Sequence, residues 1–189
     1  MTQEALFENL ETERLLLRRF TPQDAEFVLR HFGDPEVTKY LLDAAPLATI
    51  EQAHTLIDQY LSPTARTFNR WVLVHKDDQA AIGTCGFHKW NQRSFRAEVG
   101  YDLSPEYQGR GLMIEALHAA LQHGFDVLKL HRIEAFVYVE NDRSMRLLER
   151  LGFSQEGMLR DFFYLNGSFH DHTIWSLLRS EWSPVQNEE

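Results

Sequence analysis

The sequence is poor in cysteine, in long apolar runs and in basic residues, and each shortage excludes a class of protein. Cys85 is the single cysteine of 189 residues, so no intrachain disulfide can form, which is typical of a reducing compartment such as the cytoplasm. No stretch approaches the roughly 20 apolar residues that a membrane-spanning helix needs. The first residues, 1–5, have no basic region ahead of an apolar run, so we expect neither a signal peptide nor a membrane partner.

Basic residues are outnumbered by acidic ones. The chain has 19 Lys and Arg against 28 Asp and Glu, which gives a formal net charge of −9 at pH 7. Non-specific binding to nucleic acid needs a basic surface, so we expect no nucleic-acid partner. An acidic surface suits a cationic substrate, although it is also the ordinary solvated surface of a globular protein.

Apolar residues make up 43% of the chain and include 13 Phe and four Trp, which is ample material for a core. A chain of this length buries about 70% of its unfolded surface. We expect one domain over residues 13–182, an N-terminal arm over residues 1–12 and a C-terminal tail over residues 183–189.

The order of the expected elements indicates a mixed α/β domain. Thr21 and Thr49 are helix-start signals, Gly152 is a helix stop, and Asn166–Gly167 indicates a hairpin. A helix over 111–127 between two strands requires a parallel crossover. The expected elements are strands at 14–20, 68–75, 80–90, 95–103, 133–139, 153–165 and 168–178, with helices at 21–32, 50–61, 111–127 and 141–151 and a short helix within 34–48.

Residues 101–113 contain the most informative local pattern. A predicted strand ends near Leu103, Gln108-Gly-Arg-Gly111 follows, and then the helical pattern begins. The first N–H groups of a helix have no intrahelical partner and lie at the positive end of the helix dipole. The pattern therefore predicts a phosphate site at a helix N-terminus, but Gly-x-Gly also occurs in ordinary turns.

Taken together, the element order and four stretches resemble the GNAT acetyltransferase superfamily, and most closely its RimJ/RimL-like branch, which acetylates protein N-termini. The resemblance runs from about Glu11 to Trp182. It implies a GNAT-type fold, with a central, splayed, mostly antiparallel sheet flanked by helices. The four stretches are 13–18, 103–113, 141–157 (with Asn141-Asp-Arg-Ser144 and Leu151-Gly-Phe153) and the hairpin around 166–167 that ends in Glu181-Trp182.

The resemblance also implies how acetyl-coenzyme A, the expected co-substrate, is held. Backbone amides of 108–113 bind the pyrophosphate, and the pantetheine arm lies in the gap beside the strand that ends at Leu103, whose N–H faces the thioester oxygen. Met113 departs from the Gly or Ala common there, which is tolerable where only its N–H is used. Asn141 binds the pantetheine or caps its helix, and Arg110 contacts phosphate or is an ordinary exposed arginine. The implied cofactor residues are Leu103, Gln108, Gly109, Arg110, Gly111, Leu112, Met113 and Asn141.

Amine acylation needs a proton acceptor, and Glu98 is the candidate. Alternation along the strand places Glu98 and Gly100 on one face and Val99 and Tyr101 on the other. A carboxylate within a central strand indicates a cavity or a charged partner, so Glu98 is either the base, or the residue that positions a water, or a partner of Arg93 or Arg96.

The leaving thiolate needs a proton donor, and here the chain departs from the family. GNAT enzymes commonly place a tyrosine on the helix after the asparagine motif, at the position of Leu148. Ser144, in the first turn of that helix, is the candidate acid or thiol anchor that the RimL-like resemblance implies, and its alternative role is a helix cap. The missing tyrosine also leaves open a non-catalytic acyl-coenzyme A binder.

The remaining reactive residues give weaker signals. His170 and His172 share a strand face but lack a third ligand, so we expect no metal. His88 and Trp90 either shape an amine pocket or simply pack, and Cys85 is expected to be a small buried apolar residue.

The expected activity is transfer to a primary amine, with a protein N-terminal α-amine favoured over a small amine such as a polyamine, an amino acid or an aminoglycoside. The hairpin over 153–178 offers an edge for a homodimer.

Overall fold

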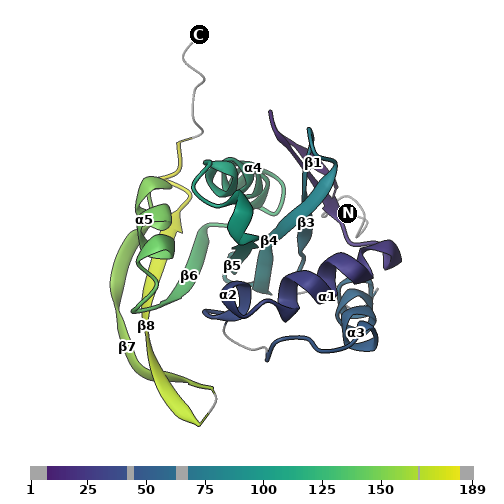
Figure 1. The fold of residues 1–189 in the computed structure, drawn as a ribbon. Helices are drawn as coiled ribbons and strands as arrows, with labels where there is room; N and C mark the ends of the chain where they lie inside the picture. Colours follow the sequence, from purple (N-terminus) through teal and green to yellow (C-terminus); the bar gives the residue numbers. More distant parts are fainter. Residues whose placement is uncertain (1–7, 42–44, 63–67, 166, 184–189) are drawn as a thin grey trace.

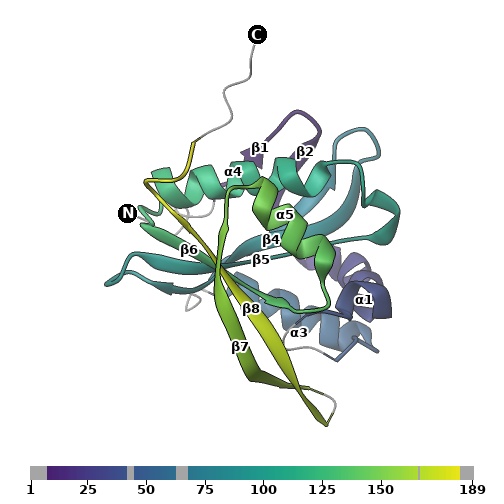
Figure 2. The same cartoon turned by 90° about the vertical axis from the view of Figure 1, so that its left-hand side faces the viewer.

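One eight-stranded sheet organises the protein, and two groups of helices cover its two faces (Figures 1 and 2). The structure is a computed structural model that describes residues 8–41, 45–62, 68–165 and 167–183. The strand order is β1-β2-β3-β4-β5-β6-β8-β7, and all neighbours are antiparallel except β5 and β6. The predicted mixed α/β fold, with a mostly antiparallel sheet and one parallel crossover, is confirmed.

All seven predicted strands are present, within a few residues of their predicted ends. The short β1 is additional, since residues 1–12 were expected to form a loose arm, yet Leu10 and Glu11 pair with Leu17 and Leu16. A strand of two residues is too short to show alternation in the sequence. The strands are β1 (Leu10–Glu11), β2 (Leu15–Arg19), β3 (Trp71–His75), β4 (Ala80–Asn91), β5 (Arg96–Leu103), β6 (Arg132–Tyr138), β7 (Ser154–Leu165) and β8 (Ser168–Leu178).

The predicted helices are confirmed as well, and their caps explain where they begin. The Thr49 hydroxyl accepts from the Gln52 N–H at 3.4 Å, while the Gln52 side chain accepts from the Thr49 N–H at 3.1 Å. The helix expected from Thr21 begins with a 3₁₀ turn over Pro22–Asp24. The helices are α1 (Ala25–Gly33), α2 (Pro35–Thr38), α3 (Ile50–Leu61), α4 (Leu112–Asp126) and α5 (Asp142–Arg150).

A separate hydrophobic core fills each face of the sheet. Leu117 and Leu121 of α4 and Leu148 of α5 are fully buried against one face, in a core that reaches Trp175 of β8. On the other face, α1 and α3 pack over β2 and β3. Within the described ranges, no helix combines the length and apolar character needed to cross a membrane.

The parallel pair β5 and β6 separates partway along its length, and this separation positions the site. The register pairs Arg96 with Arg132 and ends at Glu98 with Glu134, whereas β5 stays paired with β4 as far as Leu103. From residue 99 onward, the β6-facing edge of β5 therefore borders a gap in the sheet instead of a neighbouring strand. This is the splay that the family resemblance implies.

Asn166, in the predicted Asn-Gly turn between β7 and β8, lies outside the described residues, as do residues 1–7 of the expected arm and 184–189 of the expected tail. Gly167 has a φ of +84°, which is a left-handed conformation favourable to glycine. β7 occupies one end of the strand order. Pairing of this edge across a homodimer stays a prediction.

Candidate active site

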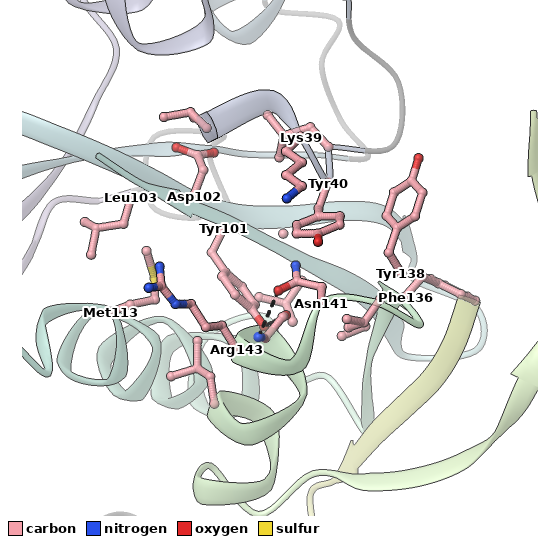
Figure 3. Close-up of a pocket in the computed structure, with 18 of the residues that line it drawn as sticks. Lys39, Tyr40, Tyr101, Asp102, Leu103, Met113, Phe136, Tyr138, Asn141 and Arg143 are labelled. Carbon is pink, nitrogen blue, oxygen red and sulfur yellow. Dashed lines mark hydrogen bonds between the residues drawn. The ribbon is translucent and has the colours of Figure 1, made fainter. Parts of the chain in front are cut away.

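A cleft of about 1560 Å³ lies where β5 and β6 diverge (Figure 3). This volume exceeds the roughly 300–1,000 Å³ of an ordinary small-molecule site, so there is space for two substrates. Successive side chains of β5 face opposite sides of the sheet: Tyr101 contacts Ser144 of α5, whereas Asp102 contacts His31 of α1. Lining residues come from both sides, so the cleft passes through the sheet.

The glycine turn before α4 has the geometry of an anion site. Gly109 and Gly111 each have a φ of +77°, which L-residues with a Cβ rarely adopt. Gly111 is the N-cap of α4, and the Leu112 and Met113 side chains are buried beneath it at 1% and 8% exposure. Because the Met113 side chain is largely buried in the core, its bulk does not obstruct the turn.

The side chains of Arg143 and Arg14, which come from distant segments, hold this turn in place. The Gln108 amide donates to the Leu103 carbonyl at 2.9 Å and accepts from the Arg143 guanidinium of α5. Arg14 donates to the Arg110 carbonyl at 3.0 Å and to Glu115, in the first turn of α4, at 2.6 Å. The turn is therefore fixed before any ligand arrives.

Arg110 itself points away from the cleft. Its guanidinium lies 5.2 Å from the ring centroid of Tyr107, and its side chain is not part of the cleft lining, unlike Gln108, Gly109 and Gly111. This placement agrees with the exposed-arginine alternative, and a phosphate contact of Arg110 stays a prediction. The Arg110 carbonyl anchors Arg14.

Leu103 and Asn141 lie on opposite sides of the cleft. The Ser104 N–H donates to the Ile82 carbonyl of β4 at 2.8 Å. Successive N–H groups of an extended chain point to opposite edges, so the Leu103 N–H points toward the gap. The Asn141 side chain accepts from the Ser144 N–H at 3.2 Å, which makes it the N-cap of α5 while it also lines the cleft.

Tyr101 is a residue that the sequence analysis did not assign to the site. Its hydroxyl lies 2.6 Å from the Ser144 hydroxyl, across the gap between β5 and α5 (Figure 3). Burial raises the pKa of Tyr101, and the hydrogen bond with Ser144 only partly offsets this, so the phenol stays protonated. The tyrosine absent at Leu148 is thus matched by a phenol that reaches the cleft from β5.

Glu98 lines the cleft on the opposite face, and its ion-pair partner was predicted wrongly. Its carboxylate lies 2.9 Å from Lys89 Nζ, whereas Arg96 contacts Glu134 at 3.5 Å. The Glu98 side chain is 13% exposed and the Lys89 side chain 73%. The register of β4 and β5 pairs His88 with Glu98, which brings the next residue, Lys89, alongside.

A buried charged network lies beneath this face of the cleft, and no local sequence pattern predicts it. Asp102 accepts from the Arg70 guanidinium, from the Thr84 hydroxyl at 2.6 Å and from the Thr84 N–H at 3.0 Å. His31 Nε2 lies 2.6 Å from the same carboxylate. Burial alone would raise the pKa of Asp102, but Arg70 and His31 outweigh it and hold this pKa well below its usual range.

His88 completes this network as a neutral imidazole. Its Nε2 lies 2.9 Å from Arg70 Nη1, and since the guanidinium can only donate, His88 accepts. Burial, followed by the charge of Arg70, lowers the pKa of His88 to about 3. His88 lines the cleft but is not a base at neutral pH, while Trp90 packs against the core.

The other candidate residues, Cys85 and His172, are not part of the cleft lining. Burial raises the pKa of the Cys85 thiol to about 12, so Cys85 is a buried apolar residue, as predicted. His172 packs on Tyr138 with 4.2 Å between ring centroids. Among the described residues, no three His, Cys, Asp or Glu side chains gather in a way that would hold a metal ion.

Comparison with known proteins agrees with this geometry. The family described as "Acetyltransferase (GNAT) domain" matches residues 14–154, a range that contains β5, the glycine turn, α4 and α5. The chain belongs to the GNAT acetyltransferase family.

The names of its GNAT relatives state different acceptors, or none. "Uncharacterized N-acetyltransferase YoaA" of Bacillus subtilis is 38% identical over 92% of this chain and 98% of its own length. "[Ribosomal protein uS5]-alanine N-acetyltransferase" of Escherichia coli is 37% identical over 59% of this chain and 58% of its own. The crystal structure of spermidine N-acetyltransferase from Vibrio cholerae in complex with CoA and spermine is 26% identical, with a TM-score of 0.80, over 90% of this chain and 98% of its own.

Proposed function

We propose that this GNAT enzyme uses acetyl-coenzyme A to acetylate a primary amine by direct transfer in a ternary complex, and that the amine is the α-amino group of a protein N-terminus. The observation that carries the proposal is the separation of β5 from β6 directly beside the glycine turn of α4. An acyl donor lying in this gap would have its phosphates at the turn and its thioester within the sheet.

The donor would be held mainly by backbone groups. The free N–H groups at the start of α4 would bind the pyrophosphate, with Gly109 and Gly111 giving the turn its shape. The open edge of β5 would pair with the pantetheine arm as an added strand does. The Leu103 N–H would donate to the thioester oxygen as negative charge develops on it. Asn141 lies on the opposite wall, where its amide nitrogen is available to the arm.

Glu98 would take the proton that the amine loses, directly or through a water. An α-amino group has a reference pKa near ~8 and a lysine side chain near ~10.4, so a single carboxylate base suits the α-amine better. The neutral amine nitrogen attacks the thioester carbonyl carbon and forms a C–N bond. Collapse of the tetrahedral intermediate then breaks the C–S bond.

Ser144 would supply the hydrogen bond or proton that the leaving sulfur needs. The two hydroxyls lie 2.6 Å apart and Tyr101 stays protonated, so Tyr101 would donate to the Ser144 oxygen and leave the Ser144 hydrogen for the cleft. The Ser144 O–H would thus face the sulfur, and Tyr101 would act as a positioning residue. Ser144 would then regain a proton from solvent, or the amine proton that Glu98 has accepted.

A small amine is the second candidate acceptor, since the name of one similar structure states spermidine as its acceptor. A non-catalytic acyl-coenzyme A binder is the third. Release of free thiol from acetyl-coenzyme A, measured with N-terminal peptides and with small amines, separates the three. Thiol release that depends on a peptide supports the proposal, and binding of acetyl-coenzyme A without transfer to any amine would support the binder.

A further inference from the structure

Aromatic rings form one wall of the cleft on the face that Glu98 shares with Asp102. Ala135 and Val137 of β6 belong to the core under α4 and α5, so Phe136 and Tyr138 face the other way. Tyr40, just after α2, lies 5.7 Å from Tyr138 between ring centroids. Phe162 of β7 stacks on Phe136 at 5.1 Å, with 13° between the ring planes. We call these four cleft-lining residues the aromatic wall: Tyr40, Phe136, Tyr138 and Phe162.

The charged groups beside the aromatic wall are already paired with groups of the protein itself. The two cleft carboxylates that are shielded from water, Glu98 and Asp102, contact Lys89 and Arg70. A lysine also lies near each of two rings of the wall, because Lys89 Nζ lies 5.6 Å from the Phe136 centroid and Lys39 Nζ lies 5.2 Å from that of Tyr40.

This arrangement disfavours an acceptor with several ammonium groups. A second ammonium would meet Lys39 and Lys89 and would find no unpaired buried carboxylate in the described part of the cleft lining. The other carboxylates of the lining, Glu36, Glu140 and Asp142, are exposed at the rim, where water screens them. By contrast, an aromatic side chain removes roughly 150–250 Å² from water when it is buried against such rings.

We propose that the acceptor carries one amino group, and that the side chain next to it is aromatic or large and aliphatic. The side chain packs on the aromatic wall, which directs the amine toward Glu98 and the gap. This inference rests on the proposed function and narrows it. Among α-amines, it selects those with an apolar neighbour and excludes alanine and polyamines as preferred acceptors.

A series of amino-acid amides tests the preference without a protein substrate. Phenylalanine amide, leucine amide, alanine amide and spermidine are each assayed for thiol release at saturating acetyl-coenzyme A, and kcat/KM is corrected for the neutral fraction of each amine. We expect phenylalanine amide to exceed alanine amide by about tenfold or more, since an apolar pocket discriminates on this scale. Equal or better transfer to alanine amide or spermidine would overturn the inference and leave the acetyltransferase function standing.

Variants of the aromatic wall locate the preference. Phe136→Ala should lower the ratio of kcat/KM for phenylalanine amide over alanine amide at least severalfold. Phe162→Ala should act in the same direction, and its ring is 40% exposed, so the fold tolerates its loss. Phe169→Ala is the matched control, because Phe169 is 63% exposed on β8 and lies outside the cleft lining.

The outcomes separate the two proposals. A ratio unchanged in Phe136→Ala and Phe162→Ala overturns the role of the aromatic wall. If no amine of any class releases thiol while acetyl-coenzyme A still binds, as measured by calorimetry, the proposed function fails and the inference fails with it.

Discussion

The Tyr101 hydroxyl lies 2.6 Å from the Ser144 hydroxyl, and this contact joins β5 to α5 across the gap in the sheet. The two residues are 43 positions apart, and both line the cleft. Because burial keeps the phenol protonated, it can donate to the serine oxygen, and we infer that it does so and leaves the serine hydrogen for the cleft.

Tyr101→Phe should therefore lower kcat by about tenfold or more, at the lower end of what acid–base groups contribute, with little change in the KM for acetyl-coenzyme A. The variant keeps the ring and removes only the hydrogen bond. Steady-state kinetics and the solvent isotope effect on kcat check this, with Tyr164→Phe on the exposed hairpin as the control. A kcat equal to that of the unaltered enzyme would show that Tyr101 only packs.

Glu98→Gln should reduce kcat/KM for the amine by about a hundredfold, since general bases contribute on that scale. Its affinity for acetyl-coenzyme A should be kept. Lys89→Met is the matched control, because it breaks the same 2.9 Å ion pair but leaves the carboxylate. If both variants lose activity equally, Glu98 matters only through the ion pair.

Gly109→Ala should weaken acetyl-coenzyme A binding, because a Cβ at a φ of +77° costs about 1–2 kcal/mol and favours other conformations of the turn, which would have to return to this one to bind. The space around it is not limiting, since an added Cβ would meet nothing within 4 Å. Gly157→Ala is the control, because that site is equally open but has no left-handed backbone. Calorimetric titration measures the difference, and equal affinities in the two variants would exclude the conformational argument.

Asp102→Asn should destabilise the fold by about 3–5 kcal/mol, because it leaves Arg70 charged and buried without its partner. Asp126→Asn breaks an exposed pair with Arg179 and should cost at most about 1 kcal/mol. Urea unfolding at pH 7 compares the two variants. A loss for Asp102→Asn no larger than that for Asp126→Asn would contradict the importance of the network.

His88 should make the protein less stable as the pH falls. Its folded pKa is about 3 and its unfolded value is near ~6.5, so between these values the unfolded chain binds more protons. Its contribution to stability is therefore complete above about pH 6.5 and declines as the pH falls toward about 3. His88→Gln should flatten the dependence of the unfolding free energy on pH over this window, whereas His54→Gln, exposed on α3, is the control. An unchanged slope in His88→Gln would argue against a buried neutral imidazole.

Much of the fold could be predicted because its signals are local. Thr49 marks the start of α3, and Gly152 follows the end of α5, because caps and stops depend only on a few neighbouring residues. The glycine turn was recognisable for the same reason. Asn141 caps α5, which is one of its two proposed roles, and it lines the cleft, whereas its binding of the pantetheine stays a prediction.

The rest depends on contacts that no local pattern encodes. His31 and Asp102 are 71 residues apart, and Arg70 and Asp102 are 32 apart, so only the packing of α1 on the sheet and the register of the strands unite them. The partner of Glu98 was mistaken because it follows from the pairing of β4 with β5. That pairing shifts register after His88, which simple alternation does not foresee.

The separation of β5 from β6 after Glu98 means that the hydrogen-bond ladder between these two strands is incomplete. A substitution that drew the two strands together would finish the hydrogen-bond ladder and make the empty protein more stable, but it would seal the passage between the two faces. Folding and turnover therefore place opposite demands on the same stretch of backbone. Selection for thermal stability alone would be expected to close it.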